Sequence, residues 1–383
     1  MKDLNNNKQQ TNNKTTNNKQ QKIMKKYFVI AAAAALVLGA CSKNIIDETS
    51  TGNVIGFSTY SPTPTKAGGS FVTGTNFLGV NADDQLIGVY AYNTGSVTYA
   101  DATHTPNFMT DVKVKLLNDG GTASSSYTPV RYWPTDEANN KLTFFAYYPN
   151  LTGNNITKTV GTGLVDFSFS IPDTKPINDI DFMVADAVID QVYSSNTGVV
   201  PFVFRHQLTQ VNFFVNTDNT DANTTIKIKT VKVLQIKTSG KLTSTYSSGT
   251  TTEWGTLGGK TDFIIYNVAA GAALSTAAQQ IGETADSYYC GTEVNAYRYL
   301  MIPQEIGDDV KVEIVYDVIT DGVTTTNTFT GDAAKKLNTA GSITAWGKNQ
   351  KINYTITVGL KPIEFTATVE TGWTPESSGG LTF

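Results

Sequence analysis

The stretch Thr225–Ile236 reads TIKIKTVKVLQI, in which isoleucine and valine alternate with lysine and threonine. Successive side chains of a strand point to opposite sides, so this alternation is typical of a strand with one buried face. β-branched residues also favour strands. The stretch therefore predicts a long, half-buried β-strand.

Similar runs recur along most of the chain, bounded by Gly, Asn, Asp or Pro, which favour turns. Strands at this density predict an all-β protein built from sandwiches. The one helix candidate is the alanine-rich segment Ala269–Gln280. The other strand candidates are Leu86–Tyr92, Lys141–Tyr148, Gly163–Ile171, Val200–Phe204, Leu208–Val215, Asp262–Val268, Tyr297–Ile302, Val310–Ile319, Lys351–Val358 and Pro362–Val369.

A polar segment, Asn216–Thr224 (NTDNTDANT), separates two strong strand candidates. It has no large apolar side chain, which favours a connection between folded units. The length of the chain agrees with two hydrophobic cores of ordinary size. We therefore expect an N-terminal sandwich over 54–220 and a C-terminal sandwich over 221–383.

The composition argues against several classes of function. Only 16% of the 383 residues are charged, and the formal net charge is -4. Lysines are scattered rather than clustered, so the chain lacks the basic patch that nucleic-acid binding requires. Two histidines and two distant cysteines cannot build a zinc site of the usual spacing. After residue 40 the chain carries 22 positive and 32 negative charges and is distinctly acidic.

Residues that could carry chemistry have plainer structural explanations. His206 lies between two apolar runs without a second histidine, cysteine or paired carboxylate near it in sequence. Carboxylate pairs such as Asp308-Asp309 stand beside turns, where aspartate is favoured. No serine has the local context of a nucleophile elbow. We expect no catalytic residue, metal site or cofactor. Tyr132-Trp133 and Trp373 are candidates for stacking on a sugar, although core packing is the commoner role.

The first 40 residues have the pattern of an export signal. Residues 1–22 form an Asn/Gln/Lys/Thr tract that cannot bury enough surface to fold. Met24-Lys25-Lys26 then precedes the apolar run Tyr27–Leu38, which is too short to span a bilayer. We expect a signal peptide with a low-complexity extension over 1–40, with Met24 as an alternative start.

The ending Leu38-Gly39-Ala40-Cys41 resembles a bacterial lipobox. The resemblance implies cleavage before Cys41 and acylation of that cysteine, since several acyl chains such as palmitate give durable anchoring. Residues 41–53 would then form a lipidated tether to the outer membrane. The alternative is an ordinary secretory signal followed by a chance cysteine.

A set of local patterns is similar to the fimbrillin family, the type V pilins that Gram-negative oral and gut anaerobes export as lipoproteins. The set begins at Val54–Tyr60 (VIGFSTY) and covers nearly the whole chain after Cys41. Its other members are Leu86–Asn93, Val130–Pro134, Leu142–Pro149, Asp181–Ala185, Phe202–Val215, Arg298–Gln304, Ala345–Val358 and Pro362–Val369.

The resemblance implies two transthyretin-like Greek-key sandwiches, few or no helices, and polymerisation by strand exchange at the cell surface. A trypsin-like protease would cut the precursor at Lys66–Ala67 and release its first strand, in which Ile55 and Phe57 share one face. A strand from another pilin subunit would then add to the exposed groove through backbone hydrogen bonds.

The candidate donor strand lies at the C-terminus, where Ile363, Phe365, Ala367 and Val369 alternate with polar residues. One feature departs from the family pattern. Shaft pilins of the best-known kind are cut after arginine, and the three arginines here lie in or beside expected strands. Either a protease that accepts lysine acts at Lys66, or the subunit is an unprocessed anchor or accessory protein.

The sequence thus predicts a non-enzymatic pilin subunit of a fimbrium, exported as an outer-membrane lipoprotein and supporting adhesion to a host or glycan ligand. The alternative is a monomeric surface lipoprotein that binds glycans.

Overall fold

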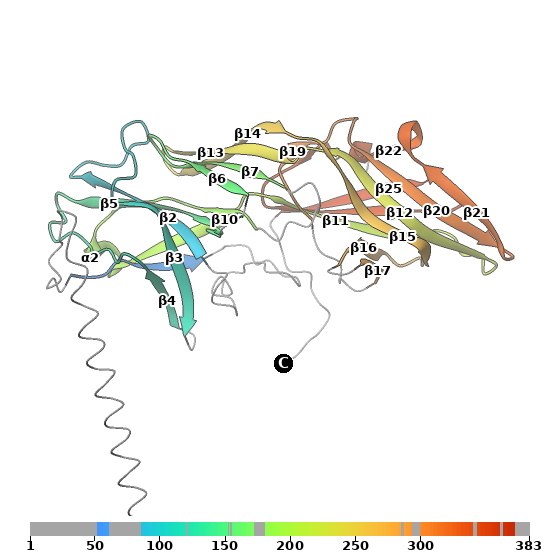
Figure 1. Ribbon diagram of the computed structural model, residues 1–383, viewed down its shortest axis with the longest axis horizontal. Coiled ribbons are helices and arrows are strands. Elements are labelled where there is room, and N and C mark those ends of the chain that lie inside the picture. The colour runs from blue at the N-terminus through green and yellow to red at the C-terminus, as the bar shows by residue number, and fades with distance from the viewer. Residues whose placement is uncertain are drawn as a thin grey trace, which may run out of the picture. The chain divides into compact units, whose positions relative to one another are not determined.

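The computed structural model describes residues 52–60, 86–119, 122–151, 153, 155–171, 181–284, 287–292, 299–339, 343–360 and 363–371. These residues form an all-β fold (Figure 1). Helical structure among them is limited to α2 (Tyr193–Asn196) and the two 3-10 turns η2 (Gly331–Ala333) and η3 (Leu337–Thr339). The predicted all-β class with few helices is confirmed.

The N-terminal strands form an eight-stranded sheet. In spatial order it contains β1 (Gly56–Tyr60), β10 (Val199–His206), β8 (Met183–Ala185), β5 (Lys141–Tyr148), β2 (Leu86–Gly95), β3 (Met109–Asp119) and β4 (Thr122–Tyr127), with β9 (Val188–Gln191) paired to β5. A four-stranded sheet lies beside it (Figure 1). It contains β14 (Thr250–Gly258), β13 (Ser239–Tyr246), β7 (Asp166–Ser170) and β6 (Ile156–Thr159).

The remaining strands form three further sheets. The first is a six-stranded sheet of β17 (Tyr288–Gly291), β16 (Gln279–Glu283), β11 (Thr209–Asn216), β24 (Gln350–Thr357) and β25 (Glu364–Thr371), with β18 (Tyr299–Met301) paired to β11. The second is β15 (Thr261–Ala273), β12 (Thr224–Ile236), β20 (Lys311–Thr320) and β21 (Val323–Phe329), with β22 (Lys335–Lys336) paired to β20. The third joins β19 (Gln304–Glu305) to β23 (Ala345–Trp346).

The centre of the eight-stranded sheet, at β2, β5 and β8, is buried on both faces. In β5, Phe144 and Ala146 belong to one core cluster, whereas Phe145 and Tyr147 belong to the other. The rings of Tyr147 and Phe167 of β7 are 5.1 Å apart, so the four-stranded sheet covers the second face. A strand covered on both faces needs apolar residues at every position. This explains why β2 and β5 read as continuous apolar runs.

The stretch that predicts a half-buried strand is β12. Ile226, Ile228, Val231 and Val233 are buried, while the lysines between them are partly exposed. β12 pairs with β15 on one side and β20 on the other, so it lies inside its sheet. Its apolar face shares one core with side chains of the six-stranded sheet, including Tyr354.

The helix expected over Ala269–Gln280 is wrong. Residues up to Ala273 continue β15, and Gln279 begins β16. Ala272 and Ala273 pair with β12, and Gly271 adopts a φ of +66 at an irregularity of this pairing. Tertiary pairing thus overrides the helical propensity of alanine.

Strand pairing crosses the boundary expected at 220/221. β11, from the first segment, pairs in parallel with β24, and β13, from the second segment, pairs with β7. The division into domains over 54–220 and 221–383 stays a prediction, and each segment contributes at least one strand to the sheets of the other.

Two consecutive residues at the end of β10 each pair with an aspartate. His206 Nδ1 is 2.8 Å from Asp181 Oδ1, and both side chains are fully buried. Arg205 Nη2 is 2.7 Å from Asp186 Oδ2, but the Arg205 side chain is 56% exposed. The adjacent pairs differ mainly in burial, which decides how much each contributes to stability.

We predict that Asp181→Ala lowers the free energy of unfolding by about 3 kcal/mol, because it leaves a buried imidazole without its carboxylate. Asp186→Ala, the matched exposed variant, lowers it by less than about 1 kcal/mol. Urea unfolding of the two variants measures both values. Equal losses of unfolding free energy in the two variants would show that burial of the His206–Asp181 pair adds nothing to stability.

Candidate functional site

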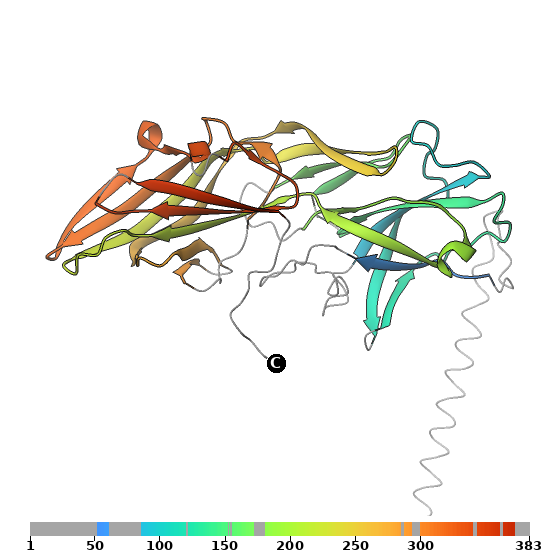
Figure 2. The ribbon, with the colours of Figure 1, turned by 180° about the vertical axis from the view of Figure 1, so that it is seen from behind.

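β1 is held along one edge by β10. The two strands are parallel, with Gly56 opposite Val199 and Phe57 opposite Val200. Figure 2 shows the blue β1 beside the yellow-green β10. At the start of β1, the Ile55 N–H donates to the Arg131 carbonyl at 3.0 Å. Gly56–Tyr60 therefore have a backbone ladder to β10, whereas Ile55 bonds to Arg131, which lies outside β10.

Ile55, just before β1, and Phe57 share an apolar and buried face, which continues at the partly buried Thr59. Ile55 is 0% exposed and Phe57 2%. The Phe57 ring stacks on Phe202 at 5.8 Å and meets the edges of Tyr127 at 5.5 Å and Phe144 at 6.0 Å. Such aromatic pairs add about 0.5–1.5 kcal/mol each beyond the area they bury. We call the space that Ile55 and Phe57 fill, between β10 and β4, the β1 slot.

The other edge of β1 faces β4, and two side chains hold it there. The Phe57 N–H donates to Ser125 Oγ at 3.0 Å, and the Tyr127 hydroxyl donates to the Ile55 carbonyl at 2.8 Å. Burial raises the pKa of Tyr127, so its hydroxyl keeps the proton that it donates. We call Ser125 and Tyr127 the edge clamp.

The candidate donor strand is β25, at the end of the six-stranded sheet. It pairs antiparallel with β24 along its whole length, and the two appear as the red pair in Figure 2. Ile363 is buried, Phe365 and Ala367 pack against the core, and Val369 is 46% exposed. The alternation expected from the sequence is present. β1 and β25 belong to different sheets of the chain.

On the polar face of β25, a network of side chains joins this strand to β24 and β11. Lys351 Nζ of β24 is 3.6 Å from Glu370 Oε2 of β25, and the lysine side chain is only 3% exposed. The Asn353 amide donates to Glu370 Oε1 at 3.1 Å, and the Asn212 amide of β11 donates to Asn353 at 2.8 Å. Departure of β25 would therefore separate a buried ammonium group from a carboxylate.

Several expected site residues lie outside the described part of the chain. These are Cys41, the bond Lys66–Ala67 and the sugar-stacking candidate Trp373. The signal peptide over 1–40 and residues 41–51 of the tether lie outside it as well.

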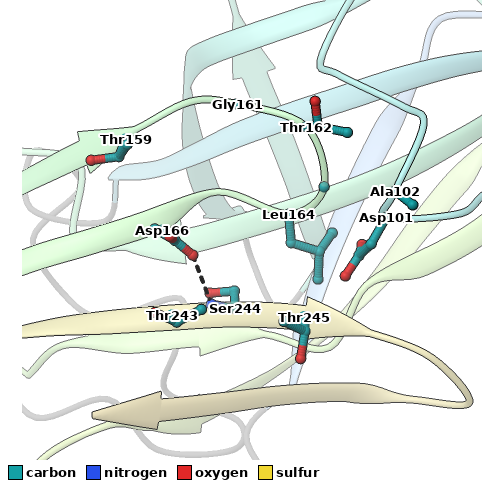
Figure 3. A pocket seen from close by; sticks show the side chains of 11 residues that line it. Asp101, Ala102, Thr159, Gly161, Thr162, Leu164, Asp166, Thr243, Ser244 and Thr245 are labelled. Carbon is teal, nitrogen blue, oxygen red and sulfur yellow. Dashed lines mark hydrogen bonds between the residues drawn. The ribbon is translucent and has the colours of Figure 1, made fainter. Parts of the chain in front are cut away.

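A surface pocket between the segments around Asp101 and Asp166 does not resemble a catalytic site. It has a volume of about 550 Å³, and Asp101 and Asp166 line it (Figure 3). Asp166 accepts a hydrogen bond from the Ser244 N–H at 3.0 Å and lies 2.8 Å from Lys241. Asp101 accepts one from the Tyr246 N–H. Both carboxylates thus cap N–H groups of β13 where its pairing with β7 has ended.

Other reactive groups in the described residues are also structural. No cluster of three or more His, Cys, Asp or Glu side chains there could hold a metal ion. Cys290 is a free thiol, and burial raises its pKa to about 11, so it remains protonated at neutral pH. Trp133 is buried and donates to the Gly198 carbonyl at 3.0 Å, as a core residue does. Within the same residues no helix has the length and apolar character needed to cross a membrane.

Sequence reasoning did not find the edge clamp. β4 reads TASSSY, which is a weak strand signal. Nothing in it indicates that Ser125 and Tyr127 bond to a segment about seventy residues earlier.

We predict that Glu370→Gln loosens β25, because the buried Lys351 would face a neutral amide. Glu370 is partly exposed, so the loss is about 1–2 kcal/mol, or roughly tenfold faster opening. Hydrogen exchange of the β24 and β25 amides measures it. Glu364→Gln, on the same face of β25, is the matched control and leaves exchange unchanged. Equal exchange in the two variants would mean that the Lys351 pair does not hold the strand.

The chain is similar to known fimbrial proteins. The relative called Fimbrium subunit Fim1C, from Phocaeicola vulgatus, is 26% identical over 382 residues, covering 90% of this chain and 96% of that protein. A crystal structure of a fimbrial protein from Bacteroides vulgatus shares the fold with a TM-score of 0.55, at 24% identity over 84% of this chain and 99% of that one. The family model described as Fimbrillin-like matches residues 72–373. The chain therefore belongs to the fimbrillin-like family of structural, non-enzymatic proteins.

Proposed function

We propose that this chain is a fimbrial subunit at the cell surface, which assembles with other pilin subunits by exchanging the strand in the β1 slot. It supports adhesion to a host or glycan ligand through the fibre. The observation that carries the proposal is the way β1 is held. It fills an apolar slot, yet it has a backbone ladder on one side only.

The chemistry of the slot supports exchange. Without β1, the rings of Phe144 and Phe202 would lose their cover, and burying one such side chain is worth about 1.5–3 kcal/mol. The N–H and C=O groups along β10 would also lack partners. A new strand restores both, with backbone bonds giving affinity and alternating side chains giving register.

Processing would make β1 removable. The proposed scissile bond, Lys66–Ala67, comes six residues after the last residue of β1. A trypsin-like protease that cuts there would leave β1 held by non-covalent contacts alone. Before the cut, acylation of Cys41 would tether the same segment to the outer membrane. Lipid anchoring and strand release would thus act on one short piece of chain.

The C-terminal strand β25 is the proposed donor. It is the last strand of its sheet in the described residues, so it leaves without breaking pairing on a second side. Its apolar face, formed by Ile363, Phe365, Ala367 and Val369, would enter the slot of another copy. Its departure costs the contact between Glu370 and Lys351.

We predict that a chain starting at Ser42, with a site-specific protease sequence inserted at Lys66–Ala67, forms ladders that resist mild denaturant once it is cut. The reason is that cutting frees β1 and opens the slot. The uncut chain is the matched control and stays monomeric. Native gels and size-exclusion chromatography follow the reaction. A cut chain that stays monomeric would contradict strand exchange and favour the solitary glycan binder.

A further inference from the structure

Two segments at opposite ends of the chain share a residue pattern. Residues 55–59 read IGFST and residues 363–367 read IEFTA. In both, isoleucine and phenylalanine two positions apart lie on one face and pack into a core. The first segment is the present occupant of the β1 slot.

Resting on the proposed strand exchange, we propose that residues 363–367 of a second copy enter the β1 slot parallel to β10 in one register. Ile363 takes the place of Ile55, and Phe365 takes the place of Phe57. In this register Phe365 meets the three aromatic rings that now surround Phe57.

The slot accepts the larger residue at the second position. Glu364 would replace Gly56, whose added Cβ would lie 3.3 Å from Val199 Cγ2. The Val199 side chain is 41% exposed, so it has room to turn away. A surface cavity of about 380 Å³ borders Gly56 and takes the rest of the glutamate.

At the fifth position of the five-residue segment, the donated strand carries the residue better suited to the slot. Thr59 Oγ1 is buried and has no hydrogen-bond partner among the described residues. A buried hydroxyl without a partner destabilises the strand that carries it. Ala367 would stand in its place and has no hydroxyl. At this position the donated segment therefore fits the slot better than β1 does, which favours the exchange.

The edge clamp suits either occupant. Ser125 and Tyr127 bond to main-chain groups of β1, the N–H of Phe57 and the C=O of Ile55. In the proposed register the donated strand presents the N–H of Phe365 and the C=O of Ile363 at the same points. A slip of one residue would turn the apolar face outward. The clamp thus holds the backbone of either occupant, while the buried side chains set the register.

Disulfide trapping between copies tests the register. Gly56 lies opposite Val199, so Glu364 of the donor would lie there too. In a Cys290→Ser background, the cut chain carrying Val199→Cys and Glu364→Cys should form intermolecular disulfides along the ladder. The pair Val199→Cys and Thr366→Cys, two residues out of register, is the matched control and should not cross-link.

The outcomes separate the register from the exchange itself. Cross-linking of the Glu364→Cys pair alone supports the proposal. Cross-linking of the Thr366→Cys pair instead overturns the register and leaves strand exchange intact. If the cut chain without cysteine substitutions forms no polymer, the proposed function fails, and this register fails with it.

The clamp has a test of its own. Ser125→Ala and Tyr127→Phe should each speed subunit loss from the polymer about fivefold, because each removes one hydrogen bond to the donated backbone. Ser126→Ala alters the exposed neighbour in β4 and should leave the rate unchanged. Equal rates for Ser125→Ala and Ser126→Ala would exclude the clamp from holding the donor.

Discussion

The central physical feature of this protein is the burial of Ile55 and Phe57 by a segment whose continuous backbone ladder runs along only one edge. Both side chains lie in the core, yet β1 itself is only five residues long and begins just after Ile55. Hydrophobic burial holds the strand and sets its register, and the backbone ladder to β10 adds to its affinity. The contacts that hold β1 in place are thus the same ones that a replacing strand would make.

The rest of the N-terminal structure maintains this slot. The eight-stranded sheet has β1 and β4 at opposite ends of its strand order, yet the two strands are in contact. The apolar cluster that surrounds Phe57 includes Phe144 and Phe202, which come from β5 and β10. The four-stranded sheet packs on the other face and stiffens the scaffold through rings such as Phe167. A rigid scaffold allows one strand to be replaced without refolding the others.

Sequence reasoning found what depends on local pattern. The alternation of Thr225–Ile236 predicted β12, and Ile55, Phe57, Ile363 and Phe365 have the faces expected of them. It missed features that depend on distant contacts. The clamp exists because β4 comes close to β1, and residues 269–273 of the Ala-rich segment are strand because β15 pairs with β12. Neither contact leaves a signal in the residues that make it.

Electron cryomicroscopy of fibres assembled from the cut chain tests the central claim most directly. The account predicts density beside β10 that continues into a neighbouring subunit, with an isoleucine and a phenylalanine in the slot. A slot that still holds residues 55–57 of its own chain, or one that stays empty within a stable fibre, would contradict it.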